Sequence, residues 1–120
     1  MSTVLVVDDS MTEMQVITIC LQRGGLSVQT ATSGEEALVK INTQKPDVII
    51  LDVVLPGRSG FELCRDLKSE AGTSMIPVVM CSTKGSEMDK FWGMKQGADA
   101  YITKPIDQAK LLQTVKQLLK

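Results

Sequence analysis

The chain has 120 residues, of which 43% are hydrophobic and 22% charged, and its net charge is −1. This composition is typical of a folded globular protein, and the length fits a single domain over residues 1–120. The near-neutral charge, without any block of basic residues, argues against nucleic-acid binding.

Short apolar runs alternate with segments of helical period along the whole chain. The runs predict strands at Val4–Val7, Ser27–Ala31, Val48–Leu51, Val78–Cys81 and Ala100–Thr103. The helical patterns cover Thr12–Gln22, Glu35–Ile41, Gly60–Lys68, Glu87–Lys95 and Gln108–Leu119. Regular alternation of strand and helix indicates an α/β fold, in which right-handed crossovers build a parallel sheet covered on both faces.

The cysteines and the missing histidine limit both the compartment and the chemistry. Cys20, Cys64 and Cys81 are odd in number and widely spaced, which favours the reducing cytoplasm over a disulfide framework. No apolar run approaches the roughly 20 residues that span a bilayer, and the N-terminus does not resemble a signal peptide. We therefore expect a cytoplasmic protein without membrane insertion. Because there is no histidine, Ser-His-Asp catalysis and His-based zinc sites are excluded.

Polar residues stand where four of the predicted strands end. Asp8 and Asp9 follow the first strand, Asp52 the third, Ser82 the fourth and Lys104 the fifth. In a doubly wound sheet, ligands bind beyond the carboxyl ends of the strands, at the point where strand order reverses. A carboxylate such as Asp52 directly after a buried run must also be paired, liganded or used, because its desolvation costs several kcal/mol otherwise.

Each of these residues also has a simpler explanation. Asp9 or Ser10 could cap the next helix, since "SMTE" fits a capping box. Asp52 could be a turn residue ahead of a Pro-Gly pair, Ser82 an ordinary loop residue and Lys104 a solvated charge. Their joint placement after apolar runs favours a common functional site over separate structural roles.

Four stretches resemble the response-regulator receiver family, of which CheY-like regulators are the single-domain type. They are "VLVVDDS" at 4–10, "DVIILDVVLPGRSG" at 47–60, "IPVVMCST" at 76–83 and "GADAYITKP" at 97–105. The resemblance covers nearly the whole chain in the family's order and spacing. It implies a flavodoxin/CheY-like doubly wound (βα)5 fold, with a five-stranded parallel sheet in the order 2-1-3-4-5, and no output domain.

The same resemblance implies a set of site residues. Asp52 would be the phosphoacceptor, with Mg²⁺ (or Mn²⁺) bound directly by Asp9, Asp52 and the backbone carbonyl of Val54. Asp8 would act on the metal mainly through a water molecule. Lys104 would supply a second positive charge and Ser82 a hydrogen bond to the phosphoryl group. The Lys104–Pro105 peptide bond is expected to be cis, as it is in the family.

The resemblance also implies how the domain is used. The phosphoryl donor would be a phosphohistidine on a sensor kinase, and the product is the modified domain itself, so we do not expect a true enzyme. Ser82 and Tyr101 would form the switch. A downstream partner, expected in motility, would bind the face of the fourth helix, fifth strand and fifth helix, which carries Lys90, Lys95, Tyr101 and Ile106. We expect a monomer or weak dimer.

Three features of the sequence differ from the chemotaxis pattern. Val54 replaces an amide side chain and Lys84 replaces an acid, both beside the path of an attacking water. The stretch "STKG…FWGMKQGA" resembles the PilG/PilH-type regulators of type IV pilus motility. Within it, a repeat at helical spacing predicts core positions, while Trp92 falls off that stripe and is expected to be partly exposed. The repeat comprises Met88, Phe91 and Met94.

Two other classes of protein also place acidic residues on such a sheet. Mg²⁺-dependent phosphatases of the haloacid-dehalogenase kind form an aspartyl phosphate, but they need a second acid where this chain has Val54. An FMN-binding flavodoxin would need a Ser/Thr-rich phosphate loop after the first strand, where this chain has "DDSMTE", and aromatic residues are only 3%. The phosphoacceptor switch therefore remains the favoured function.

Overall fold

Five strands and five helices alternate along residues 2–119, the part of the chain that the computed structural model describes. The strands are β1 (Thr3–Val7), β2 (Ser27–Ala31), β3 (Val48–Leu51), β4 (Val78–Ser82) and β5 (Ala100–Thr103). The helices are α1 (Met11–Arg23), α2 (Gly34–Thr43), α3 (Gly60–Ser69), α4 (Glu87–Lys95) and α5 (Gln108–Leu118). None of these helices has the length and apolar character needed to cross a membrane.

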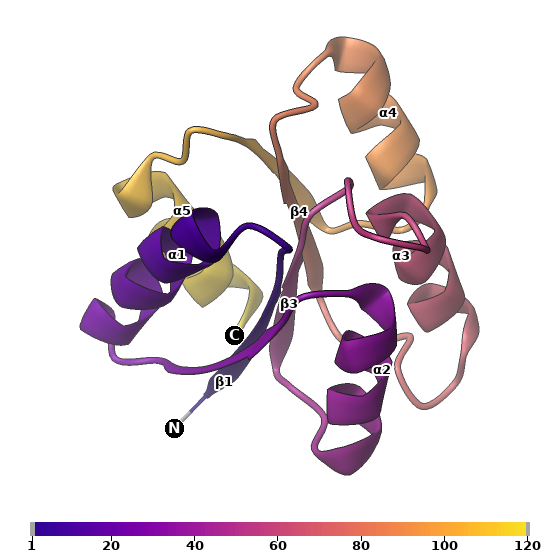
Figure 1. The fold of residues 1–120 in the computed structure, drawn as a ribbon, viewed down its shortest axis with the longest axis horizontal. Coiled ribbons are helices and arrows are strands. Elements are labelled where there is room, and N and C mark those ends of the chain that lie inside the picture. The colour runs from indigo at the N-terminus through magenta and orange to yellow at the C-terminus, as the bar shows by residue number, and fades with distance from the viewer. Residues whose placement is uncertain (1, 120) are drawn as a thin grey trace.

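The strands form one parallel sheet in the order β2-β1-β3-β4-β5. The predicted fold class and strand order are therefore confirmed. Helices α1 and α5 cover one face of the sheet, while α2, α3 and α4 lie on the other (Figure 1). Because strand order reverses between β1 and β3, the carboxyl ends of these two neighbours lie at the switch point of the sheet.

Alternation along the strands builds a separate core on each face of the sheet. On β1, Leu5 and Val7 point into the core beneath α2 and α3, whereas Val4 and Val6 point into the core beneath α1 and α5. The side chains of β3 and β4 divide in the same way. Two-sided burial explains why these strands are continuous apolar runs instead of alternating ones.

Capping side chains determine where the helices begin. Ser10, Ser33, Ser59, Ser86 and Asp107 each accept a hydrogen bond from the backbone N–H three residues later. These contacts satisfy backbone donors that have no partner inside the helix. Two of the helices begin one residue earlier than the apolar pattern predicted, since the cap, and not the first apolar residue, sets the start of the helix.

The prediction that Met88, Phe91 and Met94 belong to the core is wrong. Their side chains are 75%, 57% and 49% exposed. The buried residue of α4 is Gly93, where an added Cβ would lie 2.9 Å from Cδ2 of the Tyr101 ring. Glycine lets the helix backbone approach the aromatic ring, and the large apolar side chains on the other sides of the helix are left facing solvent.

Candidate functional site

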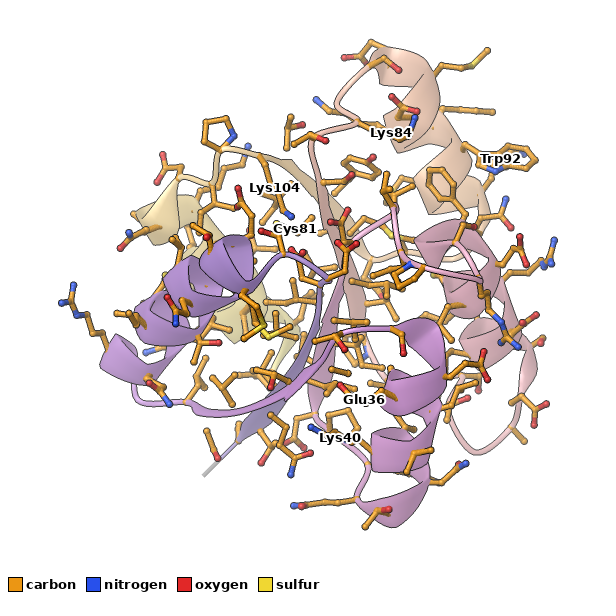
Figure 2. The ribbon with its side chains drawn as sticks, viewed as in Figure 1. Glu36, Lys40, Cys81, Lys84, Trp92 and Lys104 are labelled. Carbon is orange, nitrogen blue, oxygen red and sulfur yellow. The ribbon has the colours of Figure 1, made fainter. Side chains whose placement is uncertain are left out.

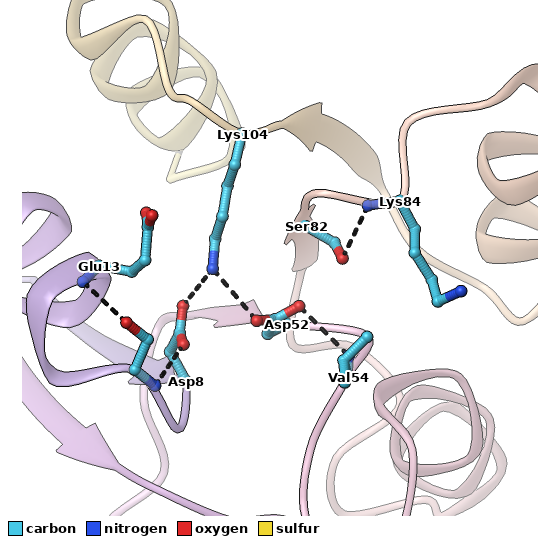
Figure 3. A network of polar contacts seen from close by, with 8 residues as sticks. Asp8, Glu13, Asp52, Val54, Ser82, Lys84 and Lys104 are labelled. Carbon is cyan, nitrogen blue, oxygen red and sulfur yellow. Dashed lines mark hydrogen bonds and ion pairs between the residues drawn. The ribbon is translucent and has the colours of Figure 1, made fainter.

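The predicted polar residues meet at one edge of the sheet, where the parallel strands end (Figure 3). Asp8 follows β1, Asp52 follows β3, Ser82 is the last residue of β4 and Lys104 follows β5. Carboxylate oxygens of Asp8, Asp9 and Asp52 all lie within 4.8 Å of one another. The fold thus gathers residues that are up to 96 positions apart in the chain.

The Lys104 ammonium spans two of the three carboxylates. Its Nζ lies 2.5 Å from Oδ2 of Asp8 and 3.1 Å from Oδ2 of Asp52, and all three side chains are buried. Burial acts to lower the pKa of Lys104, but the hydrogen bonds to Asp8 and Asp52 outweigh it, so the pKa lies above its usual value. The lysine therefore stays charged and compensates the buried acids. The peptide bond between Lys104 and Pro105 is cis, as expected.

Backbone N–H groups hold the two buried carboxylates in place. Ser10 N donates to Oδ1 of Asp8 at 2.9 Å, and Val54 N donates to Oδ1 of Asp52 at 3.2 Å. The second contact shows that Asp52 does act as a turn residue, in addition to any other role. At the start of α1, the cap is Ser10 and not Asp9, whose exposed carboxylate is left at the mouth of the cluster.

The oxygen atoms of this cluster fit a hard divalent cation. Mg²⁺ and Mn²⁺ prefer carboxylate, carbonyl and water oxygens, and Mg²⁺ keeps several of its waters. Asp8 and Asp52 are already oriented by backbone N–H groups, and Asp9 is open to solvent beside them. Three carboxyl groups face one ammonium, so the cluster carries an excess of negative charge that a cation would neutralise.

The loop that follows β4 lies against the other side of Asp52. Ser82 is fully buried, and its hydroxyl accepts a hydrogen bond from Lys84 N at 3.3 Å. Figure 3 shows the Lys84 side chain directed away from Asp52, so its ammonium is not part of the cluster in this conformation. Val54 lies at the open side of the site with an exposed side chain.

Tyr101 connects β5 to the same loop. Its hydroxyl donates a hydrogen bond to the backbone carbonyl of Lys84, two residues after Ser82. Burial raises the pKa of Tyr101 to about 12, with a further contribution from the charges of Asp89 and Asp52. The tyrosine therefore keeps its proton and remains a hydrogen-bond donor to the loop.

The residues proposed for the output surface lie on α4, on β5 and in the segment between β5 and α5. Lys90 and Lys95 are on α4, where Lys95 is exposed and Lys90 is partly buried. Ile106 is partly buried against the core beneath α1 and α5. Lys90 and Ile106 therefore offer only part of their side chains to a partner, and the role of this surface stays a prediction.

Gly60 is a positioning residue that the sequence pattern did not single out. It is the first residue of α3, and its N–H donates to the carbonyl of Val53 at 2.8 Å. A Cβ at this position would lie 2.0 Å from the backbone carbonyl oxygen of Asp52. The signal was a glycine directly after the Ser59 cap, which allows α3 to begin against the backbone of the acidic cluster.

A doubly wound sheet with an acidic cluster at its switch point defines the class of protein, and comparison with known proteins identifies the family. Residues 4–116 match the response regulator receiver domain, so the chain belongs to this family. As a receiver domain with an acidic pocket, it is a phosphoacceptor component of two-component signalling. The two alternative classes of protein are therefore set aside.

Particular relatives agree with this assignment. The chain is 44% identical to protein PilH of Pseudomonas aeruginosa over 99% of its own length and 98% of PilH. It is 42% identical to the transcriptional regulatory protein PhoP of Bacillus subtilis over 98% of its own length, but spans only 48% of that relative. The crystal structure of chemotaxis protein CheY4 of Vibrio cholerae superposes with a TM-score of 0.91, at 36% identity and 99% coverage of both chains.

Proposed function

We propose that Asp52 accepts a phosphoryl group from a phosphohistidine of a sensor kinase in the cytoplasm. The observation that carries this proposal is the Lys104 ammonium, which lies 2.5 Å from Asp8 and 3.1 Å from Asp52 within the acidic cluster. A buried carboxylate that is paired with a lysine and lies beside further carboxylates is arranged to react with a negatively charged group such as a phosphoryl group.

The proposed metal ligands are Asp8, Asp9, Asp52 and the backbone carbonyl of Val54. When bound, Mg²⁺ or Mn²⁺ supplies positive charge that neutralises the acceptor carboxylate and the incoming phosphoryl oxygens. The chain prepares this site through the backbone N–H groups that fix Asp8 and Asp52. Asp9 is exposed, so the cluster is accessible from solvent at this residue.

In the proposed transfer, a carboxylate oxygen of Asp52 attacks phosphorus as the bond to the donor's histidine nitrogen breaks. The Lys104 ammonium then donates a hydrogen bond to one phosphoryl oxygen, and the Ser82 hydroxyl donates to another. The product is the acyl phosphate of this chain and the dephosphorylated kinase histidine. The domain is thus changed by the reaction and does not turn over an external substrate.

The proposed output follows from the contacts of Ser82 and Tyr101. Ser82 accepts from Lys84 N, and Tyr101 donates to Lys84 O, so both side chains hold the same residue of the loop. If Ser82 turns to the phosphoryl group, the loop loses one of these contacts. A downstream partner must distinguish the two states, and the face of α4, β5 and α5 adjoins this loop.

We further propose that the partner belongs to a motility system and binds at Lys90, Lys95, Tyr101 and Ile106. The similarity to PilH of Pseudomonas aeruginosa and to chemotaxis protein CheY4 supports a motility role. Two lysines on α4 favour a helix or peptide with acidic residues, laid across this face.

Small-molecule phosphotransfer tests the acceptor assignment. The protein is incubated with acetyl phosphate and Mg²⁺, and its intact mass is measured. Wild type and Asp66→Asn, in which the altered acid lies on α3 outside the cluster, should each gain one phosphoryl group. Asp52→Asn should gain none. A wild-type mass gain in Asp52→Asn would place the acceptor elsewhere.

A further inference from the structure

Strand β2 forms one edge of the sheet, because it pairs with β1 on one side and ends the strand order on the other. The N–H of Ser27 and the carbonyl of Ala31 form backbone hydrogen bonds on the β1 side, each at 3.0 Å. Backbone groups of successive residues in a strand point in opposite directions, so those of Val28 and Thr30 point to the open side. We call these groups the β2 edge. Such an edge is a template on which another strand can pair.

The sequence of β2 offers little resistance to such pairing. Residues 26–33, "LSVQTATS", contain no charged residue, no proline and no glycine. Val28, Thr30 and Thr32 are β-branched and favour extended backbone. Uncharged segments of this kind are typical of strands that pair with copies of themselves. Charged side chains that protect this edge must therefore come from another part of the fold.

Helix α2 supplies two charged side chains at this strand. Glu36 Oε1 accepts a hydrogen bond from Thr32 N at 2.7 Å. The Lys40 ammonium donates a hydrogen bond to the carbonyl of Thr30, which is one of the groups of the β2 edge. Figure 2 shows the Lys40 side chain directed from α2 toward the sheet. Residues four apart lie on the same side of a helix, which lets both side chains reach the same strand.

A hollow of about 420 Å³ lies between β2 and α2. Gln44, the residue that caps the end of α2, accepts a hydrogen bond from Gln29 Nε2 at 3.1 Å beside this hollow. An added strand would lie about 4.8 Å from β2, in the space where the Lys40 side chain reaches the Thr30 carbonyl. Strand addition therefore requires Lys40 to leave that carbonyl. The hollow is lined by Val28, Gln29, Thr30, Lys40, Thr43 and Gln44.

We propose that Lys40, together with Glu36, blocks the pairing of β2 with the β2 strand of a second copy of this chain. The two strands would run antiparallel about a twofold axis at Gln29, so Val28 of each copy lies opposite Thr30 of the other. Both residues carry groups of the β2 edge, so this register satisfies those groups in both copies. An identical strand is the occupant that fits reciprocally and brings no charge of its own. The interface lies at the edge of the sheet opposite β5.

Removal of the Lys40 ammonium tests the proposal. Sedimentation equilibrium from micromolar to millimolar concentration should show that Lys40→Met self-associates about tenfold or more tightly than wild type, because pairing no longer breaks a Lys40 contact in either copy. Lys40→Ala, which favours helix, should behave in the same way. Lys40→Arg keeps a charged donor and should match wild type.

Lys116→Met is the matched control. Lys40 and Lys116 are each the basic residue in the last turn of a helix, and Lys116 lies exposed on α5, away from β2. The control removes the same charge and adds the same apolar side chain, so it should match wild type. Circular dichroism of each variant verifies that it is folded.

Two measurements locate the contact. In concentrated Lys40→Met, amide hydrogen exchange at Val28 and Thr30, followed by NMR, should slow because these groups become hydrogen-bonded. Trp92, the single tryptophan, is 52% exposed, as predicted, and points outward from α4 (Figure 2). Because α4 packs beside β5, at the opposite edge of the sheet, Trp92 emission should not change on association.

Several results would each overturn the proposal. They are Lys40 variants no more associated than wild type, a Lys116→Met control as strongly associated as Lys40→Met, or slowed exchange confined to residues other than Val28 and Thr30. A blue shift of Trp92 emission on association would place the contact on α4 and overturn the proposal equally. None of these measurements involves phosphate, so such a failure would leave the role of Asp52 untouched.

Discussion

At the scale of single residues, the buried Asp52 is stabilised by the groups around it. An unpaired carboxylate in this position would be strongly destabilising. Lys104 supplies the opposite charge at 3.1 Å, and Val54 N supplies a hydrogen bond at 3.2 Å. The lysine is shared with Asp8, so one ammonium serves two buried acids and the remaining negative charge is available for a cation.

Substitution of Asp9 should abolish metal binding without preventing the chain from folding. Its exposed carboxylate lies outside the Lys104 pair, so Asp9→Ala should fold with unchanged or slightly higher stability, because like-charge repulsion is relieved. Wild type should gain about 1.4 kcal/mol in its free energy of unfolding at a Mg²⁺ concentration ten times the dissociation constant. Asp9→Ala should lose this gain together with phosphorylation, as urea denaturation with and without MgCl₂ would show.

Glu62→Ala is the matched control for this prediction, because it removes an exposed acid on α3 away from the cluster. It should keep the full stabilisation by Mg²⁺. An Asp9→Ala variant that gains as much from Mg²⁺ as wild type would contradict the proposed metal site.

Val54 and Lys84 should prolong the life of the acyl phosphate. Val54 cannot hydrogen-bond an attacking water, and the Lys84 side chain is directed away from Asp52 (Figure 3). One oriented contact to the water is worth about 1–3 kcal/mol, so Val54→Asn with Lys84→Glu should speed dephosphorylation roughly ten- to a hundredfold. Mass spectrometry of the decaying phosphoprotein measures the rate. An unchanged half-life in the double variant would refute this explanation.

At the scale of helices and strands, the sequence predicted every element, and the errors are confined to the ends. Apolar runs such as Val48–Leu51 show buried parallel strands directly, because both faces of the sheet are covered. Strand order came from resemblance to a family and not from periodicity. Helix ends were less predictable, since they depend on whether a particular hydroxyl, such as that of Ser33, reaches a backbone N–H.

The packing of α4 could not be predicted from its pattern. Helical spacing of Met88, Phe91 and Met94 predicts that one face is apolar, but it cannot show whether that face meets the sheet or solvent. The decision depends on Gly93, which brings the helix backbone against the Tyr101 ring. Such a contact between two elements leaves no periodic signal in the sequence.

The starts of α2 and α3 offer a matched pair of glycines. Gly34 and Gly60 each follow a capping serine and are buried, but only Gly60 lies against the backbone of Asp52. A Cβ at Gly34 would make ordinary contacts no closer than 3.7 Å. Gly60→Ala should therefore cost about 2 kcal/mol or more in free energy of unfolding, whereas Gly34→Ala should be neutral or slightly stabilising.

Chemical denaturation of both variants measures this difference, and phosphorylation by acetyl phosphate measures how far Asp52 is displaced. Gly60→Ala should be impaired in both measurements. Equal stability of the two variants would mean that α3 moves away from Asp52 at little cost.

At the scale of the whole molecule, the fold explains why the candidate site could be predicted from the sequence. Four strands ending in polar residues must bring those residues to one edge of a parallel sheet. The sequence could not show that Lys104 spans Asp8 and Asp52, or that Lys84 points away, because these contacts depend on side-chain orientation across 96 and 52 positions of chain. Gly60 was missed for another reason: its role depends on a close approach to the backbone of Asp52, which leaves no pattern in the sequence.

The buried cysteines should report global unfolding. Cys20, Cys64 and Cys81 are free and buried, and burial raises the pKa of Cys64 to about 11 and that of Cys81 to about 12. Reaction with a thiol reagent needs the thiolate, so native protein at pH 8 should remain unlabelled, while protein in denaturant should label at all of them. Stoichiometric labelling of native protein would show that the cores open readily.

The same thiols predict the direction of the pH dependence. The folded state holds these protons more tightly than the unfolded state, so the buried protonated thiols stabilise the folded state. This stabilisation is fully present at pH values below their ordinary pKa of 9.0. Their contribution should be lost progressively as the pH rises from 9.0 toward about 12. Urea midpoints across this range would show the decline.

The central claim is that Asp52 receives the phosphoryl group, and reductive trapping tests it most directly. Borohydride reduces an aspartyl phosphate to homoserine, so the modified position can be read by peptide sequencing in a mass spectrometer. After phosphorylation by a phosphohistidine donor in the presence of Mg²⁺, homoserine should be found at position 52 and at no other aspartate. Homoserine at position 8 or 9, or none at all in protein that carries phosphate, would contradict the account.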